Sequence, residues 1–124
     1  MELVIDNREN IKIINPKINV KYSNLEVGDY VLSNKDSVYF IIERKTIQDY
    51  ANSIRDGRYR EQKQRLLSNY TLDQIIYLIE GDFCDYHKLN FSKIKSNTVY
   101  SSMINLMFRD NIKVIPVSYT HLTL

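Results

Sequence analysis

The residues with the clearest chemical potential are Glu43 and Lys45, which close an apolar run from Val38 to Ile42. On an extended strand, side chains two positions apart point to the same face, so this carboxylate and this ammonium lie together. They open residues 43–66, which hold seven basic residues against four acidic ones. A carboxylate can bind a divalent metal, and a neighbouring cation can stabilise negative charge on a phosphoryl group. The pair therefore indicates metal-assisted chemistry on a phosphate ester.

A hairpin is expected to add a second carboxylate to this pair. Residues 29–33 and 38–44 are typical of two strands joined by turn-forming residues centred on Asp36. An odd loop of three or five residues would pair positions whose numbers sum to about 72. Asp29 then lies opposite Glu43, with Cβ atoms roughly 5 Å apart.

Two further acids follow the first apolar run of the chain, where Asp6 ends a predicted strand and Glu9 lies three residues later. Carboxylates held together repel one another and raise one another's pKa unless a cation joins them. Their hard oxygens favour Mg²⁺ or Mn²⁺. The alternative is a solvated hairpin with surface salt bridges, and these residues alone leave it open.

The elements that must position these residues alternate along the chain. Apolar runs with strand periodicity are followed by stripes with helical spacing, with Thr46 and Ser92 as helix caps and a break at Asp56-Gly57. The predicted strands cover residues 3–6, 18–22, 29–33, 38–44, 74–80 and 112–117, and the predicted helices cover 47–54, 58–69 and 93–109. This order predicts an α/β protein, a three-layer α/β/α sandwich with a mixed central sheet.

The bulk composition excludes several classes of protein. A chain of 124 residues, 44% hydrophobic and 26% charged, suits one soluble globular domain. A net charge of only +2 means that nucleic-acid binding must come from local clusters of basic residues. The single cysteine, Cys84, excludes an internal disulfide, and with only His87 and His121 it cannot build a zinc site. We see no signal peptide and no long apolar run, so an intracellular protein is expected.

Several motifs resemble the nuclease domain of the XPF-type structure-specific endonucleases. Residues 43–49 match its ERKxxxD motif, and residues 53–66 match the stretch that resembles DGRYxEQKxRL. Upstream, residues 6–9 match DxRE and residues 28–30 match GDY. The motifs fall in the family's order and span residues 4–66, about half the chain.

The resemblance implies a restriction-endonuclease-like fold and metal-dependent cleavage of branched DNA, such as flaps, forks or junctions, in repair or recombination. It implies Mg²⁺ as the cofactor, with Mn²⁺ able to substitute. By matching position, the implied metal ligands are Asp29, Glu43 and Asp6. The implied catalytic residues are these three acids with Lys45, Glu9 and Asp49. The residues implied to touch phosphate or to brace the acids are Arg8, Arg44 and Arg58. Since every acid and the lysine are present, we predict an active subunit.

Two broader surfaces have more than one interpretation. The basic face of the helix from Arg55 to Arg65, which includes Lys63, fits a DNA backbone and also fits an ordinary solvated helix. The apolar residues between Val99 and Phe108 form a stripe wider than one buried face needs, so they fit either a dimer interface or packing on the sheet.

The chain departs from the family after the last predicted strand. We assign residues 1–117 to the nuclease domain, while residues 118–124 lack the family's further helix and read as a tail or a fragment end. Nothing in these 124 residues matches the family's helix-hairpin-helix domain, so we expect modest DNA affinity and pairing as a homodimer or with a related subunit. A silent DNA-binding partner subunit and a Holliday-junction resolvase remain as alternatives. The expected location is a prokaryotic cytoplasm, a eukaryotic nucleus or a site of viral replication.

Overall fold

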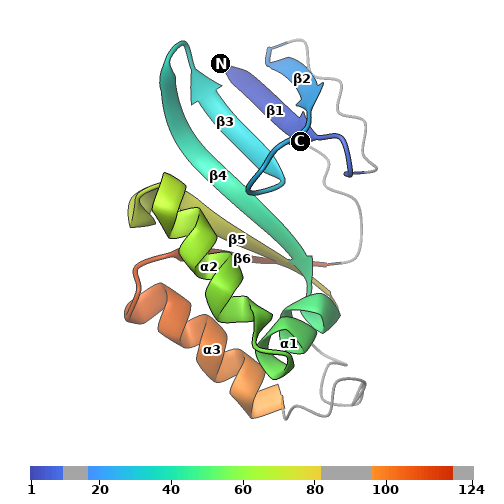
Figure 1. The fold of residues 1–124 in the computed structure, drawn as a ribbon, viewed down its shortest axis with the longest axis vertical. Helices are drawn as coiled ribbons and strands as arrows, with labels where there is room; N and C mark the ends of the chain where they lie inside the picture. Colours follow the sequence, from blue (N-terminus) through green and yellow to red (C-terminus); the bar gives the residue numbers. More distant parts are fainter. Residues whose placement is uncertain (10–16, 82–95, 119–124) are drawn as a thin grey trace.

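A computed structural model describes residues 1–9, 17–81 and 96–118, and the fold is that of a mixed sheet with helices packed against it (Figure 1). Six strands form one sheet in the order β2-β1-β3-β4-β5-β6. The strands are β1 (Glu2–Asp6), β2 (Asn19–Ser23), β3 (Tyr30–Asn34), β4 (Ser37–Thr46), β5 (Ile75–Glu80) and β6 (Lys113–Val117). The helices are α1 (Ile47–Arg55), α2 (Arg58–Asn69) and α3 (Ser96–Phe108), with a 3₁₀ turn η1 (Leu72–Gln74) before β5.

The sheet is mixed because β3 runs against its neighbours. It pairs antiparallel with β1 and with β4, whereas β1–β2, β4–β5 and β5–β6 are parallel pairs. The predicted α/β class and mixed sheet are confirmed. The ends of β1 and β4 therefore meet the start of β3 at one rim of the sheet, where the acids of the sequence motifs lie.

The β3–β4 hairpin differs from the predicted loop yet reaches the predicted register. Tyr30 to Leu32 pair with Ile42 to Phe40, so the residue numbers sum to 72 as expected. The loop itself is a two-residue turn rather than an odd loop, with Lys35 at φ 52°. A β-bulge beside Leu32 adds the extra residue on β4 that restores the register.

Helices α1 and α2 follow β4 with the bounds that the sequence predicts to within one residue. The Thr46 hydroxyl accepts a hydrogen bond of 3.0 Å from the Asp49 amide and caps α1. Gly57, at φ 77°, turns the chain between the two helices. On α2 only Leu66 is fully buried, so most of this helix faces solvent.

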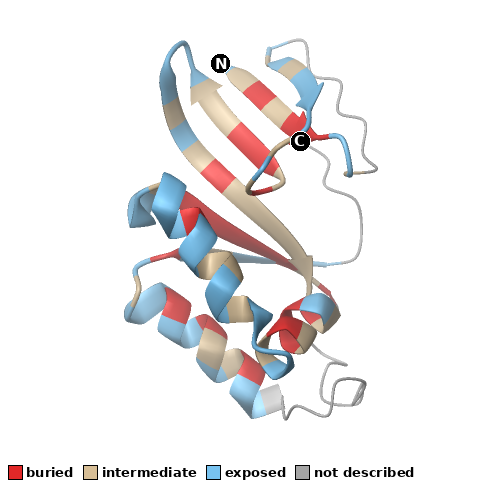
Figure 2. Cartoon of the chain, in the orientation of Figure 1, coloured by how far each residue is buried: buried red, intermediate tan, exposed pale blue. Residues whose placement is uncertain are grey.

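The two faces of the sheet carry separate apolar clusters. Figure 2 shows buried residues on β1, β3, β4 and β5 and on all three helices. One face packs against α1, α2 and α3 through Ile41 of β4, three residues of β5 and the inner sides of the helices. The opposite face holds Leu3, Ile5 and Tyr30. The described helices all pack in the first of these clusters, beside β4, β5 and β6 (Figure 1). The described residues therefore supply the sheet and one helical layer of the three predicted layers.

The apolar stripe of α3 divides between core and surface. Val99, Met103 and Leu106 are buried, whereas Phe108 is 78% exposed. The predicted cap at Ser92, like Cys84, His87 and His121, lies outside the described residues. Within the described part of the chain, every helix is too short or too polar to cross a membrane.

Candidate active site

The acids Asp6, Asp29 and Glu43 occupy neighbouring positions across the rim of the sheet, on the face that carries the helices. The Asp6 amide donates to the Asp29 carbonyl at 2.9 Å, and the Asp29 amide donates to the Ile42 carbonyl at 2.8 Å. Continuing the β3–β4 register by one residue places Asp29 opposite Glu43. Alternation along each strand then directs all three carboxylates to one face.

Asp29 and Glu43 line a cavity of about 310 Å³ between this rim and helix α2. On the strand side it is also bounded by the segment before β3 and by Arg8, and on the helix side by residues of α2. The full lining consists of Arg8, Glu26, Val27, Gly28, Asp29, Glu43, Gln62, Arg65 and Leu66. The cavity is large enough for several water molecules or for one phosphate group with its ligands.

Burial and the charge of a neighbouring acid raise the pKa of both acids: Glu9 acts on Asp29, and Asp29 acts on Glu43. Burial raises the pKa of Asp29 to about 6, against a stabilising hydrogen bond of 2.7 Å that its carboxylate accepts from the Arg44 amide. Burial, followed by the nearby Asp29 charge, raises the pKa of Glu43 to about 7. The Lys45 ammonium lowers the pKa of Glu43 in part. Two adjacent carboxyls with raised pKa values form a site that gains stability from a cation.

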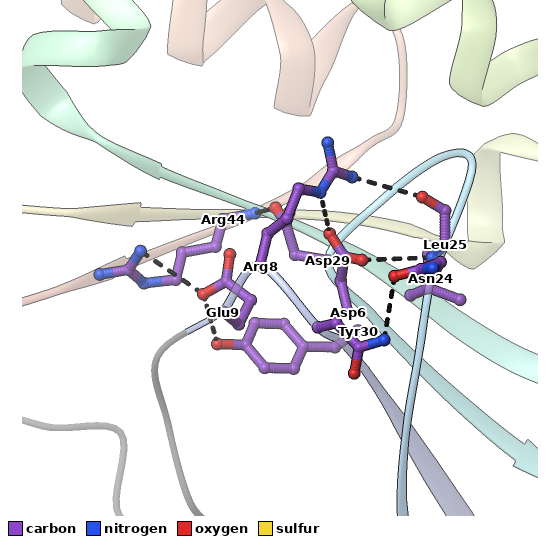
Figure 3. A network of polar contacts seen from close by, with 9 residues as sticks. Asp6, Arg8, Glu9, Asn24, Leu25, Asp29, Tyr30 and Arg44 are labelled. Atoms are coloured by element: carbon purple, nitrogen blue, oxygen red, sulfur yellow. Dashed lines mark hydrogen bonds and ion pairs between the residues drawn. The ribbon is translucent and has the colours of Figure 1, made fainter.

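Asp6 is the third acid, and its carboxylate is already engaged by the protein. Asp6 is 1% exposed. Its carboxylate accepts a hydrogen bond of 2.6 Å from Arg8 Nε and one of 3.2 Å from the Leu25 amide (Figure 3). Burial acts to raise the pKa of Asp6, but these hydrogen bonds outweigh it and the net pKa is lowered. Asp6 therefore holds Arg8 and the segment before β3 in place.

A second network, centred on Arg44, fixes the backbone of β4. The Arg44 guanidinium pairs with Glu80 at 2.7 Å and with Glu9 at 3.6 Å. Glu9 also accepts a hydrogen bond of 3.1 Å from the Tyr30 hydroxyl (Figure 3). Arg44 thus braces the acids: its side chain neutralises Glu9 and Glu80, while its amide holds Asp29.

Gly28 sets the backbone that delivers Asp29. It adopts φ +79°, and a Cβ placed there would lie 2.6 Å from two side-chain carbons of the buried Ile41. Only glycine combines this left-handed conformation with such close packing at low cost. The position is therefore specific to glycine for two separate reasons.

We expect Gly28→Ala to destabilise the fold by about 2–3 kcal/mol, because it adds a steric clash to backbone strain. Gly57→Ala is the matched control, since Gly57 has φ +77° and a Cβ added there would meet nothing within 4 Å. That variant should lose only about 1 kcal/mol. Urea unfolding measures both variants, and equal losses would show that packing against Ile41 contributes nothing.

The chain as a whole matches a known protein family. The chain matches the family model of the ERCC4 domain over residues 5–123. The chain belongs to the ERCC4 domain family. The resemblance of its motifs to XPF-type nuclease domains is thereby confirmed.

Individual relatives of this ERCC4 domain agree with that assignment. The probable crossover junction endonuclease mus81 of Dictyostelium discoideum is 39% identical over 119 residues, which cover 82% of this chain and 11% of that protein. An ERCC4 domain-containing protein of African swine fever virus is 33% identical, with 77% of this chain and 26% of that protein covered. The chain thus spans a minor part of the length of these curated relatives.

The fold of the ERCC4 domain also matches a solved structure. XPF from Aeropyrum pernix, in complex with DNA, superposes with a TM-score of 0.68 at 26% identity. The match covers 94% of this chain and 56% of that one. The restriction-endonuclease-like α/β fold is therefore confirmed.

The structure brings only some of the predicted site residues to the cavity. Asp29, Glu43 and Arg8 line it. Lys45 lies on the same strand face as Glu43, two residues further along β4. Asp49 is exposed in the first turn of α1 and does not line the cavity.

The predicted DNA-binding residues of the helices have protein partners in this ERCC4 domain. Arg55 and Arg58 both pair with Asp56. Lys63 pairs with the half-buried Asp110 and lies 5.9 Å from the centre of the Tyr59 ring. Contact of these three residues with DNA stays a prediction.

Two polar cavity residues, Glu26 and Gln62, were given no role from the sequence, whereas Arg65 belongs to the basic face predicted to contact DNA. A signal for one of them was present, because Gln62 lies four positions before the buried Leu66 and so shares the inner face of α2. Glu26 carried no periodic signal, since it lies between strands.

Proposed function

We propose that this ERCC4 domain is the catalytic part of a structure-specific endonuclease that hydrolyses phosphodiester bonds in branched DNA with a divalent cation. One observation carries the proposal. Asp29 and Glu43 face each other in a cavity, both with raised pKa values, and neither joins the ion pairs formed among the described residues.

The donor set of this cavity fits Mg²⁺. This ion is commonly bound by one or two carboxylates and completes its shell with water and substrate phosphate. Among the described residues no group of three or more acidic, histidine or cysteine side chains is gathered for a metal. Two protein carboxylates with a cavity for other ligands therefore suit Mg²⁺, or Mn²⁺ in its place, better than a cation that needs a full protein cage.

The roles of the residues follow from their positions. Asp29 and Glu43 would hold the cation, which when bound polarises a phosphate and lowers the pKa of a nearby water. Lys45, on the same face, would stabilise negative charge that develops on the phosphoryl oxygens. Asp6 and Glu9 would act indirectly, by holding Arg8 and Arg44.

Exposed arginines on both sides of the cavity support DNA as the substrate. Arg8 comes from the strand side with 74% of its side chain exposed, and Arg65 comes from α2 with 57% exposed. Guanidinium groups at the mouth of an acidic cavity can hold a phosphate backbone on either side of the scissile bond. Relatives named as crossover junction endonucleases, and a related structure solved with DNA, favour branched DNA in repair or recombination.

The exposed side of α3 supports assembly with a second subunit. Ile104, Met107 and Phe108 are 50%, 36% and 78% exposed, and they turn away from the buried half of the same helix. We include a homodimer, or a heterodimer with a related subunit, in the proposal. Analytical ultracentrifugation of wild type and Phe108→Ser tests it through the mass in solution.

A cleavage panel tests the proposed activity. Labelled 3′ flaps, forks, nicked and intact four-way junctions and linear duplex are each incubated with Mg²⁺, Mn²⁺ or EDTA. We expect cuts in flaps, forks and nicked junctions with either metal, none in linear duplex, and none with EDTA. If every substrate is bound but uncut, the chain is a silent partner subunit. Cuts confined to intact four-way junctions would instead make it a resolvase.

A further inference from the structure

Gln62 is a cavity residue that the proposed chemistry does not yet use. It lies on α2, one turn before Leu66, which is 1% exposed in the core. This spacing places Gln62 on the helix face that looks toward the sheet, across the cavity from Asp29 and Glu43. Its neighbour on the same lining, Arg65, is instead paired with the exposed Glu61.

The side-chain oxygen of Gln62 is buried and accepts no hydrogen bond from the described residues. A buried carbonyl without a donor costs free energy, and native proteins rarely keep one without a reason. One other side-chain oxygen among the described residues shares this condition, the Tyr77 hydroxyl, but Tyr77 does not line the cavity. Gln62 is therefore the unsatisfied acceptor that faces the site.

The chemistry of this oxygen restricts its partner. An amide oxygen only accepts hydrogen bonds, so it cannot pair with a phosphate oxygen, nor with Asp29 or Glu43 once both are ionised to hold a cation. The partner must bring an O–H or N–H into the cavity. A water molecule meets this need, and a hydrolase requires one there.

We propose that Gln62 is a positioning residue whose Oε1 accepts a hydrogen bond from the water that attacks the phosphodiester. This inference rests on the proposed nuclease function. In the step concerned, the water oxygen bonds to phosphorus and one ester P–O bond breaks. The water releases one proton to solvent, and the departing oxygen takes one up. Gln62 fixes one O–H of the water and so directs a lone pair toward phosphorus.

The test replaces Gln62 by Met, which keeps the length of the side chain and removes both polar atoms. We expect kcat on a 3′ flap to fall roughly 10- to 100-fold, while KM and calorimetric Mn²⁺ affinity stay within about twofold. The melting temperature should not fall, because a buried unpaired acceptor is removed. A glutamine that merely supports the fold would give the reverse pattern, with a lower melting temperature and little change in kcat.

Two further variants sharpen this test. Gln64→Met, at an exposed position of the same helix, should leave kcat unchanged. Gln62→Glu keeps an acceptor oxygen and should recover part of the lost rate. The inference fails if wild type cleaves and Gln62→Met cleaves equally well, or if Mn²⁺ affinity drops tenfold, which would make Gln62 a direct ligand. Inactive wild type overturns the proposed function itself, and this inference with it.

Discussion

Replacement of Glu43 by Gln should reduce cleavage of flap and fork substrates by about 10³-fold or more. The change keeps the size of the side chain and removes the charge that, with Asp29, would hold the cation. Fork binding, measured by fluorescence anisotropy in EDTA, should stay within a few-fold of wild type because the arginines at the cavity mouth remain. Lys45→Met should give a similar loss of rate, since Lys45 is the one cation that β4 places on the same face as Glu43.

The matched control is Glu2→Gln on β1, where the carboxylate forms an ordinary surface pair of 3.2 Å with Lys21. Its loss should leave both rate and binding unchanged. A Glu43→Gln enzyme that keeps a tenth of the wild-type rate would contradict the assignment of Glu43 as a metal ligand.

Glu43→Gln should also raise the stability of the protein at alkaline pH. Asp29 and Glu43 have pKa values of about 6 and about 7 in the folded state, against ordinary values of 3.8 and 4.5. The folded protein therefore binds protons more tightly than the unfolded chain, and its free energy of unfolding falls as pH rises from about 4 to about 7. At pH 8 this cost is fully present. Glu43→Gln removes part of it, so its melting temperature should exceed that of wild type by about 5 °C.

The dependence on pH and metal separates this effect from a general change in packing. At pH 4, where wild-type Glu43 is protonated, the two proteins should melt at nearly the same temperature. At pH 8, MgCl₂ should stabilise wild type and have little effect on Glu43→Gln. Differential scanning fluorimetry across pH 4–8 measures both effects. A difference in melting temperature that does not change with pH would show that ionisation of Glu43 does not destabilise the folded protein.

Local sequence patterns predicted the strands and helices well, because each element has its own cap, break or apolar periodicity in the sequence. Thr46 caps α1, and Gly57 separates α1 from α2, as the residue types indicate. The β5 strand is buried along most of its length, which agrees with its continuous apolar sequence. The convergence of Asp29 on Glu43 was predicted for a partly wrong reason, since a tight turn and a bulge replaced the odd loop.

Contacts between distant elements were the part that sequence patterns could not supply. Arg44 reaches Glu80, 36 positions away, and Lys63 reaches Asp110, 47 positions away. Such partners depend on how the helices pack on the sheet, which local periodicity does not fix. The same packing places Gln62 in the cavity that Asp29 and Glu43 line. It leaves Asp49 exposed, although the sequence motif predicted Asp49, and not Gln62, as a catalytic residue.

The proposed chemistry requires that Asp29 and Glu43 together hold one divalent cation. Crystals of the protein soaked in MnCl₂, measured at a wavelength with strong manganese anomalous scattering, test this requirement directly. We expect an anomalous peak in the cavity, with carboxylate oxygens of both residues about 2–2.5 Å away. The peak should disappear in Asp29→Asn. A well-ordered manganese ion elsewhere, with this cavity holding water alone at millimolar MnCl₂, would contradict the assignment of these two acids as metal ligands.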